Sequence, residues 1–263
     1  VGLALAACGS KGSGGSGSAG DTVTVVTHDS FSVPDELIAA FKEDTGYTLE
    51  LVASGDAGEL TNKLVLTKDA PLGDAFIGVD NTFASRILDE GVIDASAAVD
   101  LPEGADRYVI DDTPALTPID FGEVCINIDT AWFAEHDVTP PAAFEDLTGA
   151  DYKDLFVAIN PSTSSTGLAF LLATVGHFGT GEAGGFADYW KRLAANGMRI
   201  DEGWSDAYYT DFSGGGEGGA HPIVVSYSSS PAATLTENGS ASTTAALLST
   251  STRQVEYAGV LAG

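Results

Sequence analysis

Apolar residues along this chain follow two patterns, short β-branched runs and stretches with the 3.6-residue spacing of a helix. Residues 22–27 and 48–53 show the first pattern and are predicted to form strands. Between them the second pattern predicts a helix that presents Leu37 and Phe41 on one face and ends at Gly46. The folded part of the chain is therefore expected to begin as a β-α-β unit.

The same alternation of strand and helix patterns continues along the rest of the chain. Further strands are predicted at 75–79, 119–128, 155–160, 223–227 and 255–263. Further helices are predicted around 60–65, before Gly91, at 167–175 and at 186–196. Residues 197–201 make a poor strand, and the glycines of 214–219 are not spaced like a nucleotide-binding loop. This order predicts an α/β fold with mixed, mostly parallel sheets and flanking helices.

The N-terminal residues have a different composition from the rest. Residues 1–8 end in Leu-Ala-Ala-Cys, which resembles the lipobox of bacterial lipoproteins, and are too short to span a bilayer. Residues 9–20 are rich in Gly and Ser and predict a flexible tether. We expect Cys8 to be acylated and to anchor an extracytoplasmic protein to the cell membrane. An ordinary signal peptide with an incidental cysteine is the alternative.

The charge balance excludes some classes of partner. The 263 residues include 38 Asp and Glu against 11 Lys and Arg, which gives a net charge of −27. A nucleic-acid binder needs a basic face, and so does a protein that docks electrostatically on an anionic membrane. The acidic excess instead favours a cationic small molecule, although a salt-tolerant source would also explain it. The hydrophobic content of 44% is enough to bury a core.

The second cysteine, Cys125, lies in an apolar strand-like run. Because an acylated Cys8 could not pair with it, we expect a buried free thiol and no disulfide or cysteine-based metal site.

Polar side chains gather where several predicted strands end. In a mostly parallel sheet these ends meet, so loops from both halves of the chain are expected to line one ligand site. For any single residue a local role is simpler, and Asp56 and Asp80 are equally well placed as helix N-caps. The clusters contain His28 and Asp29, Asp56, Asp80, Ser164 and Ser165, Trp204 and Tyr227.

Two short motifs are the most specific features of the second half. They read Gly-Trp-Ser-Asp-Ala-Tyr at 203–208 and Ser-Tyr-Ser-Ser-Ser-Pro at 226–231. With looser matches at 27–31, 78–81 and 161–167, they make the chain resemble the thiamine-binding, extracytoplasmic solute-binding proteins of ABC transporters. The resemblance covers the chain after its N-terminal tether.

This resemblance implies a two-lobed fold of the periplasmic-binding-protein type II, from which a C-terminal part that completes the first lobe in the family is absent. It divides the chain into a first lobe at 21–118, a crossing strand at 119–129, a second lobe at 130–252 and a return crossing strand at 253–263. The implied ligand is thiamine or a thiamine phosphate, and the implied partners are the permease subunits of an ABC transporter. We expect a monomer that is not an enzyme, binds no nucleic acid and needs no cofactor or metal.

The resemblance also assigns the ligand-binding residues. Trp204 would stack on the ligand, Asp56 would accept from its amino group, and the Ser hydroxyls beside a helix N-terminus would suit a hydroxyl or phosphate tail. The full set is His28, Asp29, Asp56, Asp80, Ser164, Ser165, Trp204, Tyr208 and Tyr227.

Two other functions stay open at this point. The adjacent pair Tyr208 and Tyr209, with His28 and Asp56, would suit ferric iron, because phenolates are hard oxygen donors. A serine hydrolase would use the elbow-like sequence around Ser205, but it also requires a preceding strand and a later Asp and His.

Overall fold

The computed structural model describes residues 21–263 except 182 and 217. Cys8 and the tether at 9–20 lie outside these residues, so their predicted roles stay predictions. The strands are β1 (Thr22–Thr27), β2 (Thr48–Ala53), β3 (Ala75–Asp80), β4 (Thr117–Asp129), β5 (Phe156–Ile159), β6 (Arg199–Asp201), β7 (Ile223–Tyr227) and β8 (Thr244–Val260). The helices are α1 (Asp35–Thr45), α2 (Ala57–Leu66), α3 (Ala84–Asp89), α4 (Thr130–Glu135), α5 (Ser165–Phe178) and α6 (Phe186–Ala195).

The strands of the described residues form one mixed sheet in the order β2-β1-β3-β8-β4-β7-β5-β6. The pairs β1–β2, β1–β3, β5–β6 and β5–β7 are parallel, as the β-α-β pattern predicts. The pairs that β4 and β8 make are antiparallel. The α/β fold class is confirmed, and the antiparallel centre of the sheet comes from these two long strands.

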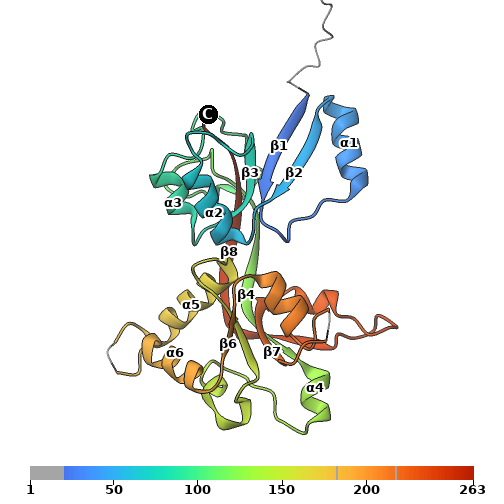
Figure 1. Ribbon diagram of the computed structural model, residues 1–263, viewed down its shortest axis with the longest axis vertical. Coiled ribbons are helices and arrows are strands. Elements are labelled where there is room, and N and C mark those ends of the chain that lie inside the picture. The colour runs from blue at the N-terminus through green and yellow to red at the C-terminus, as the bar shows by residue number, and fades with distance from the viewer. Residues whose placement is uncertain (1–20, 182, 217) are drawn as a thin grey trace, which may run out of the picture.

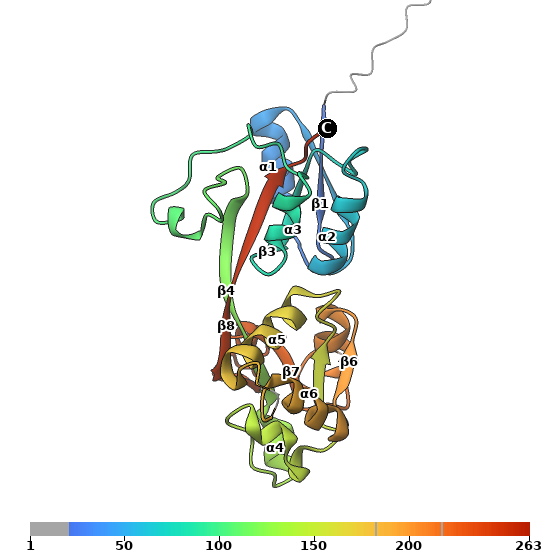
Figure 2. The same ribbon diagram turned by 90° about the vertical axis from the view of Figure 1, so that its left-hand side faces the viewer.

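The molecule consists of two lobes that β4 and β8 connect (Figure 1). β1 to β3 and α1 to α3 lie in one lobe, and β5 to β7 and α4 to α6 lie in the other (Figures 1 and 2). The described residues form two separate clusters of buried apolar side chains, one in each lobe. The predicted division into lobes at 21–118 and 130–252 stays a prediction.

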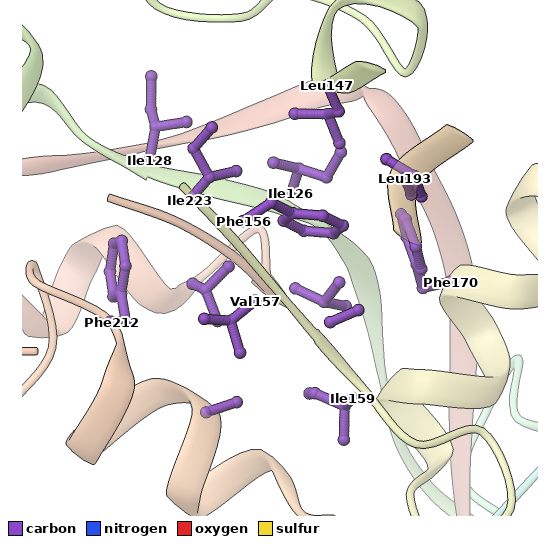
Figure 3. Packing of buried hydrophobic residues seen from close by; sticks show 14 of the residues in the cluster. Ile126, Ile128, Leu147, Phe156, Val157, Ile159, Phe170, Leu193, Phe212 and Ile223 are labelled. Carbon is purple, nitrogen blue, oxygen red and sulfur yellow. The ribbon is translucent and has the colours of Figure 1, made fainter. Parts of the chain in front are cut away.

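The second-lobe core packs both faces of a buried strand. Phe156, Val157 and Ile159 of β5 are at most 2% exposed, and Ile126 of β4 and Phe170 of α5 pack in the same cluster (Figure 3). A strand that is apolar on both faces is typical of a parallel strand covered by helices.

β8 contributes to both cores, whereas β4 contributes to the second-lobe core. β4 places Val124 and Ile126 in the second-lobe cluster, whereas β8 places Val255 and Tyr257 in the first-lobe cluster. Leu247, nearer the start of β8, packs against the second-lobe cluster. β8 is therefore anchored by apolar packing in both lobes, and β4 by apolar packing in its second-lobe half.

Three sequence predictions need correction. β6 is present at Arg199–Asp201, where the sequence makes a poor strand, because β5 supplies its parallel hydrogen-bond partners. β8 begins at Thr244, well before the predicted residue 255, because its earlier part pairs with β4. α1 ends at Gly46 as predicted, with φ of 80°, but buries none of its residues, and Leu37 is 57% exposed. Periodicity identifies an apolar face but not what covers it.

Cys125 is a buried free thiol, as predicted, and is 1% exposed. Burial raises the pKa of its thiol to about 12, so the group is protonated and unreactive at neutral pH. Among the residues that the structure describes, no helix is long and apolar enough to cross a membrane.

Candidate functional site

A cavity of about 670 Å³ lies between the two lobes. Its size is in the range of pockets that enclose small organic ligands. Side chains of both lobes and of the connecting strands line it. They include His28 and Phe31 of the first lobe, Trp204, Tyr208 and Tyr227 of the second lobe, and Asp120, Phe121, Gln254 and Glu256 of β4 and β8.

The second lobe contributes an aromatic wall centred on Trp204. The indole stacks on the Tyr208 ring, with centroids 4.9 Å apart and planes 14° from parallel. Tyr227 meets the indole edge-to-face at 6.2 Å. Because Tyr208 covers one indole face, the opposite face is the one that a flat ligand in the cavity can stack on.

Hydrogen bonds fix the orientation of this indole. Trp204 Nε1 donates to Ser226 Oγ at 2.9 Å, and Ser226 Oγ is in turn 2.8 Å from Ser230 Oγ. Both serines belong to the Ser-Tyr-Ser-Ser-Ser-Pro motif, which begins in the last two residues of β7. The two sequence motifs are therefore parts of one structure, in which the second motif holds the ring of the first.

The opposite side of the cavity is acidic. His28 Nε2 lies 3.5 Å from Glu256 Oε1, and the two side chains are only 18% and 16% exposed. Burial lowers the pKa of His28, but the hydrogen bond to Glu256 and the charges of Glu256, Asp56 and Asp29 outweigh it and raise the pKa above its ordinary value. Gly78 makes room for this ring, since a Cβ there would lie 2.3 Å from His28 Cδ2.

The two lobes touch directly at the N-terminus of α2 (Figure 2). Asp56 caps this helix by accepting from Ala57 N, and its other oxygen accepts from Trp204 N at 2.9 Å. The backbone N–H groups of Gly58 and Glu59 donate to the Thr163 carbonyl oxygen of the second lobe at 2.9 and 3.1 Å. Asp56 therefore has both roles that the sequence left open, since it caps a helix and lies at the site.

The predicted site residues fall into two groups. His28, Asp56, Ser165, Trp204, Tyr208 and Tyr227 line the main cavity or a small cavity of about 20 Å³ beside it. The other three do not line either cavity. Asp29 precedes α1 on the surface, Asp80 is fully buried, and the hydroxyl of the buried Ser164 contacts Thr166 and caps α5.

Sequence reasoning missed Asp120, Phe121, Gln254 and Glu256, which lie on the connecting strands. Gln254 and Glu256 are polar residues two positions apart on either side of Val255, which places them on one face of the strand. That alternation was the available signal. It could not show that β4 and β8 pair so that Asp120 and Glu256 face each other, because register depends on tertiary pairing.

The sequence model of a family of bacterial extracellular solute-binding proteins matches residues 70–239. The chain belongs to this family. The thiamine-binding periplasmic protein of Salmonella typhimurium is 29% identical to this solute-binding protein over 222 residues, which are 80% of this chain and 61% of the relative. The chain thus spans about three fifths of the length of that curated relative.

Solved structures share the fold of this solute-binding protein. A periplasmic thiamin binding protein superimposes with a TM-score of 0.73 and 26% identity, over 92% of this chain and 73% of the other. The iron-bound HitA of Pseudomonas aeruginosa gives a TM-score of 0.62 at 17% identity, over 91% and 75%. At that identity the second likeness shows the fold alone.

The tyrosine pair that suggested iron has an unfavourable environment for it. Tyr208 is 3% exposed and stacked, and burial, followed by the neighbouring Tyr209, raises the pKa of its phenol. A phenolate ligand must lose this proton. In the described part of the chain, no three His, Cys, Asp or Glu side chains are grouped to hold a metal ion.

The elbow-like segment around Ser205 leads into a π-helical turn at Asp206–Asp211. Within the described residues no imidazole hydrogen-bonds the Ser205 hydroxyl, and Nδ1 of His221 is buried without a partner. The nucleophile–base contact that a hydrolase requires is not formed between these groups.

We expect Gly58→Ala to destabilise the protein, although Ala normally stabilises a helix over Gly by up to about 1 kcal/mol. A Cβ at Gly58 would lie 2.6 Å from the Thr163 carbonyl carbon and oxygen, so the lobes could not keep their contact. Urea unfolding measures the effect. The matched control is Gly176→Ala in α5, where a Cβ meets nothing within 4 Å and the ordinary gain is expected. An equal gain in the free energy of unfolding for both variants would show that the α2 N-terminus does not pack against Thr163 in this way.

Asp80 should make stability depend on pH. Burial raises the pKa of its carboxyl from 3.8 to about 6, although hydrogen bonds from Thr82 oppose the shift. The folded state then favours the protonated form, so this stabilisation is complete below about pH 4 and is lost as the pH rises through about 6. At about 1.4 kcal/mol per pKa unit, the loss is at most about 3 kcal/mol.

Asp80→Asn mimics the neutral form and should reduce the fall in unfolding free energy between pH 4.5 and 7.5. Urea titrations at the two pH values measure this difference. The exposed Asp89→Asn controls for removing one negative charge from the surface. The same pH dependence in the parent and in Asp80→Asn would show that Asp80 titrates normally.

Proposed function

We propose that this protein binds thiamine in the cleft between its lobes and delivers it to the permease of an ABC transporter. The observation that carries the proposal is the composition of the cleft, which has an indole face on one side and carboxylates on the other. Among its described lining residues there is no Lys or Arg. This combination suits a flat organic cation.

The chemistry of thiamine matches both sides of the cleft. Its thiazolium ring carries a permanent positive charge, and its aminopyrimidine ring offers hydrogen-bond donors and acceptors. An aromatic face stabilises such a cation by about 0.5–2 kcal/mol, and more where water is excluded. Trp204 supplies that face, while Glu256 and Asp120 supply negative charge on the connecting strands.

Asp56 joins ligand binding to closure of the lobes in this proposal. Each of its oxygens already accepts one backbone N–H, from Ala57 and from Trp204. A carboxylate oxygen has a second lone pair, so Asp56 can still accept from the amino group of the pyrimidine. A ligand held there would strengthen the contact between the lobes, and the closed form is the shape that a permease can recognise.

The similar proteins support thiamine over other ligands of this fold. The Salmonella relative and the most similar structure described above are named as thiamine-binding, whereas HitA shares only the fold. Because the chain spans only 61% of that relative, the ligand and the transport partner are proposals for this chain. The proposal also includes an extracytoplasmic location, a lipid anchor on Cys8 and a monomeric state.

Titration calorimetry with thiamine tests the proposal. We expect binding at micromolar concentration or below for the parent protein, and at least a tenfold loss of affinity for Trp204→Ala, which is about 1.4 kcal/mol. The loss follows from removing the ring that stacks on the ligand. Absence of heat with thiamine for the folded parent protein would refute the function.

Trp132→Phe is the matched control, because Trp132 stacks on His136 outside the cleft. It should keep the parental affinity for thiamine.

Incubation with ferric citrate tests the alternative function, iron binding. Iron bound to Tyr208 or Tyr209 would produce a visible tyrosinate absorption band. We expect no such band, because the Tyr208 phenol is buried and protonated.

A further inference from the structure

The imidazole of His28 is the basic group of the cleft. Among the described residues that line the main cavity and the small cavity beside it, His28 is the only His, Lys or Arg. Its Nε2 lies 3.5 Å from Glu256 Oε1, and both side chains are largely buried. A carboxylate in such a place needs a positive partner, because burying an unpaired charge is costly. The protonated form of His28 therefore serves as the counter-ion of Glu256 in the empty cleft.

The ring of His28 is held in this position from several sides. Its other nitrogen, Nδ1, lies 3.0 Å from Ser30 Oγ. The Phe31 ring meets it edge-to-face, with centroids 6.1 Å apart. Gly78 lies against the edge of the imidazole, where a larger residue would collide with it. The ring cannot turn away without losing these contacts, so a proton on it keeps a positive charge in the cleft.

The charged groups that act on His28 come from four places in the fold. Glu256 lies on β8, Asp56 precedes α2, Asp120 lies on β4 and Asp29 follows His28 in the chain. Burial lowers the pKa of His28, but the hydrogen bond and charge of Glu256, with two of these aspartates, raise it above 6.5. A substantial share of the empty protein therefore carries this proton near neutral pH.

A cationic ligand in the cleft competes with the proton on His28. The cavity of about 670 Å³ is lined by His28 and Glu256 as well as by Trp204, so a ligand stacked on the indole shares this space with the pair. Its positive charge repels the imidazolium and is attracted by the same carboxylate. Tyr227 lines the small cavity beside the pair and stays neutral, because burial raises the pKa of its phenol. A bound cation must therefore lower the pKa of His28.

We propose that thiamine binding displaces the proton of His28, so that the cation of the ligand replaces the imidazolium as the partner of Glu256. The inference rests on the proposed function and goes beyond it, because it assigns a proton exchange to a named residue. The proton passes to the solvent, and one positive charge in the cleft is exchanged for another. Because ligand and proton compete, the affinity for thiamine falls as the pH decreases through the pKa of His28. Above that pKa this group no longer affects the affinity.

Titration calorimetry of the complete protein with thiamine tests the exchange. We expect the affinity at pH 6.0 to be at least fivefold lower than at pH 8.5. At pH 7.0 the titration is repeated in PIPES and in bis-Tris, because the two buffers take up a proton with different enthalpies. The difference in measured heat gives the number of protons released, for which we expect about half a proton or more per thiamine.

His28→Gln removes the titrating group and keeps a polar side chain of similar size. For this variant we expect less than a twofold change of affinity between pH 6.0 and 8.5 and no proton release. The matched control is His177→Gln, because His177 also pairs with a glutamate, Glu145 at 2.7 Å, but does not line the cleft. It should keep the pH dependence and the proton release of the parent protein.

Glu256→Gln tests the partner while His28 is kept. Loss of the carboxylate removes the hydrogen bond and the charge that raise the pKa of His28 most. The pH at which the affinity falls should therefore shift downward by about one unit. This measurement does not depend on whether His28→Gln folds. An unchanged pH dependence in Glu256→Gln would show that His28 does not titrate as the partner of this carboxylate.

The outcomes separate this inference from the proposed function. If thiamine binds with the same affinity at pH 6.0 and 8.5 and releases no proton, the exchange is refuted while thiamine binding stands. If His28→Gln keeps the parental pH dependence, other groups are responsible, and the assignment to His28 is wrong. Asp29 and Asp120 are then the candidates, because burial raises the pKa of both. If thiamine does not bind to the folded parent protein at any of these pH values, both proposals are refuted.

Discussion

The antiparallel ladder between β4 and β8 is the constraint on which the rest of the structure depends. Both strands belong to one sheet that continues from lobe to lobe. β8 packs apolar side chains in both lobes, and β4 packs them in the second lobe. The ladder therefore fixes how the lobes face each other and forms the back of the cleft between them. The residues that line the cleft from these strands are held by backbone hydrogen bonds, which makes them less mobile than the loops on either side.

The contact between the lobes and the lining of the cavities share two residues. Asp56 caps α2 and accepts from the backbone of Trp204, and Trp204 presents its ring to the cleft. A ligand that stacks on this ring and contacts Asp56 would therefore act at the point where the lobes meet. The proposed function thus predicts that ligand binding and lobe contact are coupled, because both would depend on the same hydrogen bonds and packing contacts.

The carboxylates of the sheet give the cleft its chemical character. Glu256 lies opposite Asp80 and Asp120 in the sheet, and buried or half-buried like charges so close together lower stability. The imidazole of His28 lies beside Glu256. A bound cation offsets the repulsion between these carboxylates. Its positive charge also replaces the water that the carboxylates lose when it binds. The overall charge of −27 adds a diffuse attraction for cations, which salt screens.

The sequence by itself determined the local elements and the identity of the motif residues. β-branched runs predicted β1, β2 and β7 to within a residue, and the Gly-Trp-Ser and Ser-Tyr motifs indicated Trp204 and Tyr227. These features depend on neighbours in the chain, where steric and hydrogen-bond preferences act over a few residues.

Only the tertiary structure decided which strands pair, in which register, and which surface each helix covers. β6 forms because β5 lies beside it and supplies its hydrogen-bond partners. α1 buries none of its residues although its sequence pattern is amphipathic. Ser164 caps α5 and does not line the cleft. The pairing of Glu256 with Asp80 and Asp120 brings together residues from distant parts of the chain. No local pattern encodes this register, because it depends on how β8 pairs with β3 and β4 in the folded sheet.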